Sequence, residues 1–377
     1  MELWRFRGEF KLAYIEFCPE CQIPKTLGDG QEWLNNGDII QSLNSSARMA
    51  FGECEFLDPL FRTIEKMIGA PIEHMLINMA ARTSALYLAL VIPIEVRKML
   101  ASRQLDMAPF IEGITTLAEA SGFAKYERLG FRYENDENDY TKYRVINPFS
   151  LPLAAGAYGG AVTGIVGGEH AVSYKEVLPN TYEFTTHWDK YPMVLKEKLP
   201  VHEYHHKEGD ICFERCPTCG LPKKLSDYQW LLEKGNIRHR LDGRRMVLLS
   251  PAMIDPIFTA LEGELGDIFP SVVVEAQCKV LKSGFTTIDI RDEDVNVRQQ
   301  LALRGFGNLK ELSLTPERMS IRLENACFFL LLAGMFQAAF EKDFGVDSNI
   351  EWEITKDQEL KLTITPKKVI LPVISSA

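Results

Sequence analysis

The sequence predicts a mixed α/β protein that consists of two copies of one unit. The segment Cys-Pro-Glu-Cys-Gln-Ile-Pro-Lys, which begins at Cys18, recurs as Cys-Pro-Thr-Cys-Gly-Leu-Pro-Lys, which begins at Cys216. In each copy this cysteine motif precedes helix signals, and each copy ends on alternating segments rich in β-branched residues. The recurring order of motif, helices and strands predicts one α/β fold made twice.

Further matches follow the cysteine motif at constant offsets. In the first part of each copy they lie 197 positions apart: Trp33 and Trp230, Arg48 and Arg245, Asp58 and Asp255, Gly69 and Gly266. Nearer the end of each copy the offset is 178, as for Asn147 and Asn325, and Gly156 and Gly334. The first copy therefore holds 19 extra residues between Gly69 and Asn147. We expect residues 1–190 to form the first domain and residues 191–377 the second.

The composition is that of a globular protein and limits its partners. Hydrophobic residues make up 46% of the 377 residues and charged residues 25%, as in chains that bury substantial cores. The net charge of −10 argues against nucleic-acid binding, because phosphate contacts need a basic surface. No signal-peptide pattern opens the chain, and four of its eight cysteines stand in Cys-x-x-Cys pairs, so we expect a cytoplasmic, reducing environment.

Two uncharged stretches, residues 151–168 and 326–340, are the most apolar parts of the chain. A membrane-spanning helix needs about 18–20 such residues, and these stretches fall at or below that length. They also occupy the same place in each copy. We expect buried core helices here and no membrane span.

The remaining elements follow in the same order in both copies. Residues 29–36 and 227–234 carry short helix signals. Longer helices are predicted at Asp58–Gly69 and Asp255–Gly266, which begin with Asp-Pro and end at glycine. After the core helix, terminal hairpins are predicted at residues 173–187 and 349–366, and residues 182–209 are the expected linker.

The cysteine pairs are the most specific chemical signal. A Cys-Pro-x-Cys turn places two sulfurs on one side of a tight loop, and two such knuckles supply the four ligands of a tetrahedral ion. We predict one structural Zn²⁺ between the copies, bound by Cys18, Cys21, Cys216 and Cys219. Iron also suits four sulfurs. Two alternatives stay open. Each knuckle could be completed separately, the second by Cys212 or by His202, His205 or His206, although the first copy then has no obvious further ligands. The pairs could also be redox dithiols.

The core helix of the first copy carries glycines at helical spacing. Glycine costs about 1 kcal/mol in a helix interior, so this face is expected to meet a ligand or another backbone closely. We predict an open ligand pocket in the first copy between this helix and residues 75–90, lined by Gly156, Gly159, Gly160, Met79 and Leu86. The second copy has large side chains on the matching helix, which predicts a smaller pocket: Phe328, Phe329, Met335 and Phe336. The alternative is that the glycines only allow close helix packing.

No catalytic motif stands out. The chain has no Walker A loop, no G-x-S-x-G and no H-E-x-x-H. The arginines of the repeated Arg-Met, Arg48 and Arg245, are expected to stabilise the fold by pairing with a carboxylate inside the protein. These absences count mildly against an enzyme.

The order of modules resembles a known pairing. The stretch from Gly235 through Arg245 to Gly266 is similar to the amino-terminal sensory segment of aromatic-responsive bacterial activators. The stretch that follows resembles the 4-vinyl reductase domain, a small-ligand module, through Gly305-Phe306, Asn325, Gly334 and Gly345. The corresponding residues of the first copy are Gly130-Phe131, Asn147, Gly156 and Gly167.

This resemblance implies that each domain is a twisted antiparallel sheet covered by helices, with an apolar ligand pocket inside. Phenol-type sensors carry a cysteine-and-glutamate zinc site in this module. Here only Cys327 lies near such a position, so the zinc is assigned to the knuckles.

The expected function is therefore the non-catalytic binding or sensing of a small hydrophobic or aromatic molecule, with a structural metal at the knuckles. Because no output domain follows, the protein would act through a partner protein or as a carrier. The alternatives are an enzyme or enzyme accessory in tetrapyrrole or aromatic metabolism, and a structural adaptor.

Overall fold

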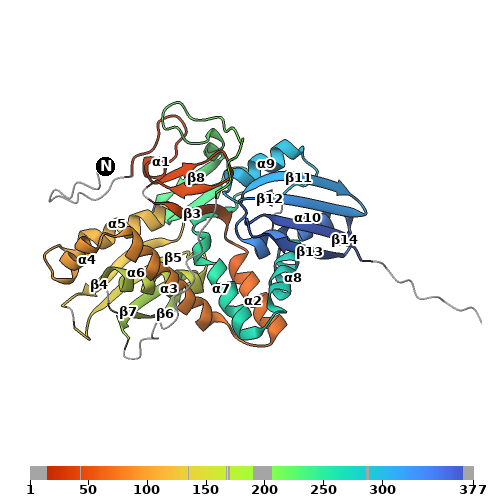
Figure 1. The fold of residues 1–377 in the computed structure, drawn as a ribbon. Helices are drawn as coiled ribbons and strands as arrows, with labels where there is room; N and C mark the ends of the chain where they lie inside the picture. The colour runs from red at the N-terminus through yellow and green to blue at the C-terminus, as the bar shows by residue number, and fades with distance from the viewer. Residues whose placement is uncertain are drawn as a thin grey trace, which may run out of the picture.

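The computed structural model describes residues 15–42, 44–134, 136–166, 168, 170–189, 206–285 and 288–367. Within these residues the protein is a mixed α/β structure whose sheets are antiparallel and packed against helices (Figure 1). This confirms the predicted fold class. Among the helices described, none has the length and apolar character that a membrane crossing requires.

The two halves contain their elements in closely similar order. The elements of the first half are α1 (Lys25–Gly30), β1 (Gln31–Trp33), β2 (Ile39–Gln41), β3 (Asn44–Glu53), α2 (Leu57–Ile68), α3 (Glu73–Val91), α4 (Ile94–Ala101), α5 (Met107–Ala120), β4 (Lys125–Arg132), β5 (Tyr140–Ile146), α6 (Leu151–Val166), β6 (His170–Leu178) and β7 (Thr181–Trp188). Those of the second half are η1 (Lys223–Asp227), β8 (Tyr228–Leu231), η2 (Leu232–Lys234), β9 (Asn236–His239), β10 (Arg245–Leu249), η3 (Pro251–Met253), α7 (Asp255–Leu265), α8 (Phe269–Lys282), α9 (Asp294–Leu303), β11 (Asn308–Thr315), β12 (Arg318–Glu324), α10 (Phe329–Phe344), β13 (Ser348–Ile354) and β14 (Leu360–Pro366).

The central sheet takes three strands from each half, in the order β1-β2-β3-β10-β9-β8. Its middle is the antiparallel pair β3–β10, in which Phe51 lies opposite Leu248. These two residues are 197 positions apart, the same offset that relates the two copies in the sequence. The strand order and this pairing place an approximate two-fold axis between β3 and β10.

Each half also contributes a four-stranded sheet of its own, β4-β5-β7-β6 and β11-β12-β14-β13. The core helix α6 packs on the first of these sheets and α10 on the second, while α3 packs along α6 and α8 along α10. Helices α2 and α7 cross between the halves, because α2 contacts α8 and α7 contacts α3 (Figure 1). The halves are thus interleaved, and the division at residue 190 stays a prediction.

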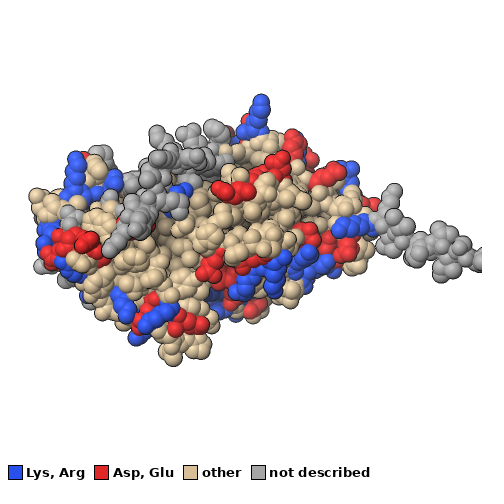
Figure 2. All heavy atoms as spheres, turned by 90° about the horizontal axis from the view of Figure 1, so that it is seen from below, with Lys and Arg blue, Asp and Glu red and all other residues tan. Residues whose placement is uncertain are grey.

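Charged side chains of both signs are interspersed on the face seen from below, around a largely uncharged middle (Figure 2). A nucleic-acid binder of this net charge would need a continuous basic area. On this face the basic and acidic residues alternate instead.

Several local predictions are confirmed and others are wrong. The longer helices at Asp58 and Asp255 are present as α2 and α7, and both terminal hairpins form. The short helix predicted at residues 29–36 is wrong beyond Gly30, because β1 pairs with β2, and residues 228–231 form strand β8. Of the expected linker, residues 182–188 belong to β7, and residues 190–205 lie outside the described residues.

The extra residues of the first copy fall at two places. Most lie in the stretch from α3 to α5, where α3 and α5 are longer than α8 and α9 and where α4 has no counterpart among the described residues of the second half. The rest lengthen the β4–β5 turn, which joins Arg132 to Tyr140, whereas the matching β11–β12 turn joins Thr315 to Arg318.

This placement corrects the match to Gly305-Phe306, which is Gly122-Phe123 and not Gly130-Phe131. The amides of Gly122 and Gly305 each donate to the carbonyl three residues earlier, and both glycines have positive φ. Gly167, the residue matched to Gly345, lies outside the described residues.

Matched side chains fasten each half to the other. The Trp33 indole donates to the Leu303 carbonyl at 2.8 Å, and the Trp230 indole donates to the Ala120 carbonyl at 3.1 Å. Each tryptophan therefore lies in one half and hydrogen bonds the last residue of the helix that precedes the outer sheet of the other half, Leu303 of α9 or Ala120 of α5.

The two arginines of the repeated Arg-Met cross in the same way. The buried Arg48 donates to the carbonyls of Gly305, Asn325 and Ala326 in the second half. Arg245 donates to carbonyls of the first half: Gly122, Phe123, Asn147 and Pro148. The expected carboxylate partner is present for Arg48, since Asp38 lies at 2.7 Å and both side chains are almost fully buried. In the second half Ile237 pairs with Met246 as Ile39 pairs with Met49, so by strand register the residue at the position of Asp38 is Asn236.

We expect Arg48→Ala to lower the free energy of unfolding by about 3–5 kcal/mol, because it leaves the buried Asp38 charge without its guanidinium. Arg245→Ala should lower the free energy of unfolding by less, since it removes the donor to several carbonyl groups but leaves no buried carboxylate without its partner. Chemical denaturation of the two variants measures both values. A larger loss for Arg245→Ala than for Arg48→Ala would contradict this account.

Candidate metal centre

The two knuckles share one backbone geometry. In the first, the Cys18 amide donates to the Ile23 carbonyl at 2.8 Å and the Gln22 amide donates to the Cys18 carbonyl at 3.0 Å. In the second, the Cys216 amide donates to Leu221 and the Gly220 amide to Cys216, both at 2.8 Å. The same tight turn is therefore built twice.

The residue after the second cysteine needs the left-handed region in both knuckles. Its φ is +75° at Gly220 and +57° at Gln22. Glycine reaches this region without strain, whereas a residue with a Cβ does so at a cost of about 1 kcal/mol. The side-chain amide of Gln22 donates to the Pro19 carbonyl at 3.1 Å, which helps to hold this turn.

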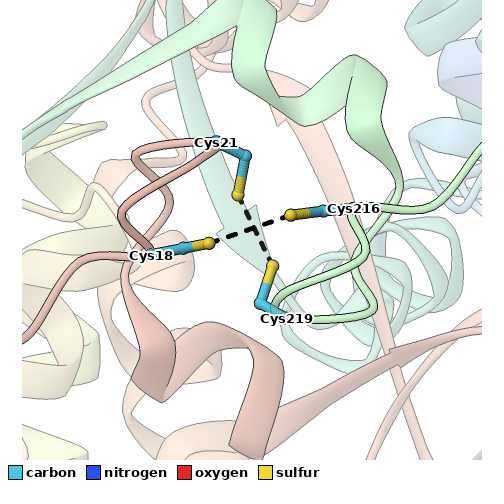
Figure 3. Close-up of side chains that lie close together, drawn as sticks. All are labelled: Cys18, Cys21, Cys216 and Cys219. Atoms are coloured by element: carbon cyan, nitrogen blue, oxygen red, sulfur yellow. Dashed lines mark hydrogen bonds between the residues drawn. The ribbon is translucent and has the colours of Figure 1, made fainter.

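The four knuckle sulfurs converge on one point between the halves (Figure 3). All lie within 4.8 Å of one another, with Cys18 Sγ 3.8 Å from Cys216 Sγ and Cys21 Sγ 3.4 Å from Cys219 Sγ. In both pairs each cysteine meets its own counterpart from the other knuckle, as a two-fold axis through the cluster requires. The prediction that the two knuckles come together is confirmed.

The dimensions fit a four-sulfur ion site. A tetrahedron with Zn–S bonds of about 2.3 Å has sulfur–sulfur edges of about 3.8 Å. Two of the six sulfur–sulfur separations, 3.4 and 3.8 Å, lie close to that edge, and all six are within 4.8 Å. Four thiolates also occupy every position of a tetrahedral ion, so the arrangement suits a closed, structural site and leaves no position for a substrate.

The cluster lies within an apolar shell. Cys18 and Cys216 are buried, Cys219 is the most exposed of the four, and Ile23, Trp33 and Leu221 pack around them. Such a shell keeps water away from metal–thiolate bonds.

The backbone of the first knuckle also favours a thiolate. Burial raises the pKa of the Cys18 thiol, but hydrogen bonds from the backbone of Cys21 and Glu20, together with those from the Cys21 and Cys216 side chains, lower this pKa below its usual value. Burial raises the pKa of Cys21 and of Cys219. Metal binding would deprotonate these thiols, because thiolates are the ligands of zinc and iron.

The alternative ligands do not join the cluster where the structure describes them. Cys212 is exposed and is not one of the four converging residues. His206 Nδ1 instead lies 2.6 Å from an Asp38 oxygen. His202 and His205 lie outside the described residues.

Cys54, Cys278 and Cys327 are buried, as expected for small apolar residues. Burial raises the pKa of each of these thiols to about 12.

The glycines predicted to line a pocket lie against backbone. A Cβ at Gly156 would be 2.3 Å from the Ile77 carbonyl oxygen, and one at Gly160 would be 2.0 Å from the Ala81 carbonyl oxygen. A Cβ at Gly159 would be 3.2 Å from the Val172 side chain. The space beside Gly156 and Gly160 is therefore occupied by α3, which matches the close helix packing weighed above.

Met79 and Leu86 lie on α3, where Met79 is buried and Leu86 half-buried. A role in ligand binding for these two residues and the three glycines stays a prediction.

Sequence reasoning did not find the residues that support the knuckles. Trp33 and Trp230 were matched only as part of the duplication, and the contact from Glu20 to Thr218, 2.9 Å between Oε2 and Oγ1, joins the knuckles directly. The offset that relates the two tryptophans is the available signal, but no pattern in the sequence shows which carbonyl groups their indoles reach.

Comparison of the chain with models of known protein families and with curated proteins finds no match. The resemblance to vinyl reductase domains stays a hypothesis.

We expect Gly160→Ala to destabilise the protein by about 1–3 kcal/mol, because its methyl group would collide with the α3 backbone. Gly263→Ala is the matched control: it also lies inside a helix, and a Cβ there meets nothing within 4 Å. The control should leave stability unchanged or raise it by about 0.4–1 kcal/mol. Thermal unfolding measures both, and an unaffected Gly160→Ala variant would disprove the close contact.

Proposed function

We propose that this chain is a non-catalytic binding protein whose two halves are fastened by one structural Zn²⁺ at Cys18, Cys21, Cys216 and Cys219. In this proposal its cargo is a small apolar or aromatic molecule, and it acts through a partner protein or as a carrier. The observation that carries the metal assignment is the convergence of four sulfurs within 4.8 Å from knuckles almost two hundred residues apart.

Three features support a structural role for the metal. The donor set is complete, so no coordination position is left for a substrate. The cluster is surrounded by apolar side chains. It also stands where the two halves meet, beside the tryptophans that bond across them. Zinc is proposed ahead of iron because closed four-cysteine sites are its usual structural sites.

Small-molecule binding is supported by the resemblance described above and by the antiparallel sheets covered by helices. A structural adaptor is the second candidate. It is favoured by one observation, namely that α3 fills the space beside Gly156 and Gly160, where a pocket was expected. Adaptor and binding protein differ in whether a ligand remains bound after purification.

Native mass spectrometry of the purified protein tests the metal and the ligand together. We expect a mass increase equal to one zinc ion per chain, and a further small organic molecule on part of the population. A chain with metal but no ligand from any preparation would favour the adaptor. Two metal ions per chain would contradict the shared site.

Substitution of the cysteines tests the role of the metal. Cys216→Ser should abolish metal binding and lower the free energy of unfolding by about 4 kcal/mol, the linkage expected when free metal exceeds its Kd a thousandfold. Cys212→Ser is the matched control, because this thiol is exposed and lies outside the cluster. Elemental analysis and thermal unfolding report both effects. Full metal content in Cys216→Ser would rule out the four-cysteine site.

A further inference from the structure

The two outer sheets and their core helices can be compared position by position. The first module is defined here as β4, β5, α6, β6 and β7, and the second module as β11, β12, α10, β13 and β14. Gly156 on α6 faces the Ile77 carbonyl, and Gly334 on α10 faces the Val274 carbonyl. Gly156 and Gly334 are 178 positions apart, and Ile77 and Val274 are 197 positions apart, which are the two offsets of the duplication. The two modules therefore place equivalent residues at equivalent positions.

The interiors of the modules differ in polarity. In the second module, Met319 lies opposite Ile364 across β12 and β14, and both are fully buried, as is Phe336 on α10. The equivalent residues of the first module are Thr141, Thr186 and Tyr158.

Their hydroxyl groups form a buried chain. The oxygens of Thr141 and Tyr158 are 2.6 Å apart, and those of Thr141 and Thr186 are 2.7 Å apart. The fold does not need these hydroxyls, because the second module has the same architecture with apolar side chains.

The next inward residue of β5 adds a hydroxyl without a partner. Tyr143 is 2% exposed, and its hydroxyl has no hydrogen-bond partner in the structure. Its ring lies 5.8 Å from that of Tyr158 and next to the chain of hydroxyls. The equivalent residue of the second module is Ile321, which is also buried in the core and has no polar side-chain atom that needs a hydrogen-bond partner. A buried hydroxyl left unpaired is unfavourable, so its presence in only one module calls for a partner.

The surroundings of Tyr143 are suited to a neutral ligand. Burial raises the pKa of its phenol to about 12, so the hydroxyl stays protonated and can donate near neutral pH. The two charged groups that act on this pKa, Arg128 and Glu112, pair with each other at 3.2 Å. Around the same core, Ile111, Phe123 and Tyr126 are only partly buried.

We infer that the first module alone binds the small molecule, between α6 and the β5–β7 strands, and that Tyr143 donates a hydrogen bond to its polar group. This inference rests on the proposed small-molecule function and adds a chemical class: a compact apolar or aromatic body that carries one neutral oxygen acceptor, such as a hydroxyl or carbonyl. Tyr158 and Thr141 lie beside that oxygen, and the second module serves as the packed structural counterpart.

The test uses the full-length protein and a pair of probes that differ by one hydroxyl, benzyl alcohol and toluene. Isothermal titration calorimetry should show benzyl alcohol binding about tenfold more tightly, the effect expected of one net hydrogen bond. Tyr143→Phe should remove this preference without lowering the melting temperature, because the hydroxyl has no hydrogen-bond partner within the protein.

Two further variants complete the design. Tyr174→Phe is the matched control, since its hydroxyl donates to Glu73 at the surface, and it should keep the preference. The triple variant Thr141→Met, Tyr158→Phe and Thr186→Ile installs the residues of the second module, and it should bind neither probe.

The outcomes separate this inference from the proposed function. Equal affinity for the two probes in the wild type, or an unchanged preference in Tyr143→Phe, would overturn the inference but leave apolar binding intact. A marked fall in the melting temperature of Tyr143→Phe would also overturn it, because the hydroxyl would then have a structural partner. Binding of neither probe by the wild type would contradict both.

Discussion

The antiparallel pairing of β3 with β10 is the constraint on which the rest of the structure depends. Phe51 lies opposite its counterpart Leu248, so the two halves are related by an approximate two-fold axis at this point. A two-fold arrangement brings every near-axis residue close to its own counterpart. The cysteines obey this rule, with Cys18 beside Cys216 and Cys21 beside Cys219. The same relation makes Arg48 and Arg245 each reach into the opposite half.

The convergence of the four cysteines could be predicted, because two copies of one knuckle that are related by a two-fold axis bring their sulfurs together. Two knuckles with two sulfurs each are incomplete as ion sites, and a two-fold relation supplies the missing ligands. The interleaving of the halves could not be predicted, because nothing local in α2 or α7 indicates which half it packs against. The local sequence at Gln31–Trp33 predicts helix, but these residues form a strand, because pairing with β2 determines their conformation. The glycines of α6 were recognised as a close-contact face, but only the structure identifies the Ile77 and Ala81 backbone on the other side.

The duplication also allows the interiors of the two modules to differ. One axis, one cysteine cluster and the crossed arginines hold both modules in place, so the interior of either can change without loss of the whole. The second module has an apolar core of Met319, Phe336 and Ile364, whereas the first has hydroxyls at the same positions. Comparison of the two copies within one chain thus separates what the fold requires from what a single module adds.

The central claim is that one metal ion on the two-fold axis is bound by all four knuckle cysteines. X-ray absorption spectroscopy at the zinc edge tests it most directly, on full-length protein purified without added metal. The account predicts a single shell of four sulfur neighbours at about 2.3 Å. A shell that contains nitrogen or oxygen neighbours at about 2.0–2.1 Å, or fewer than four sulfurs, would contradict it.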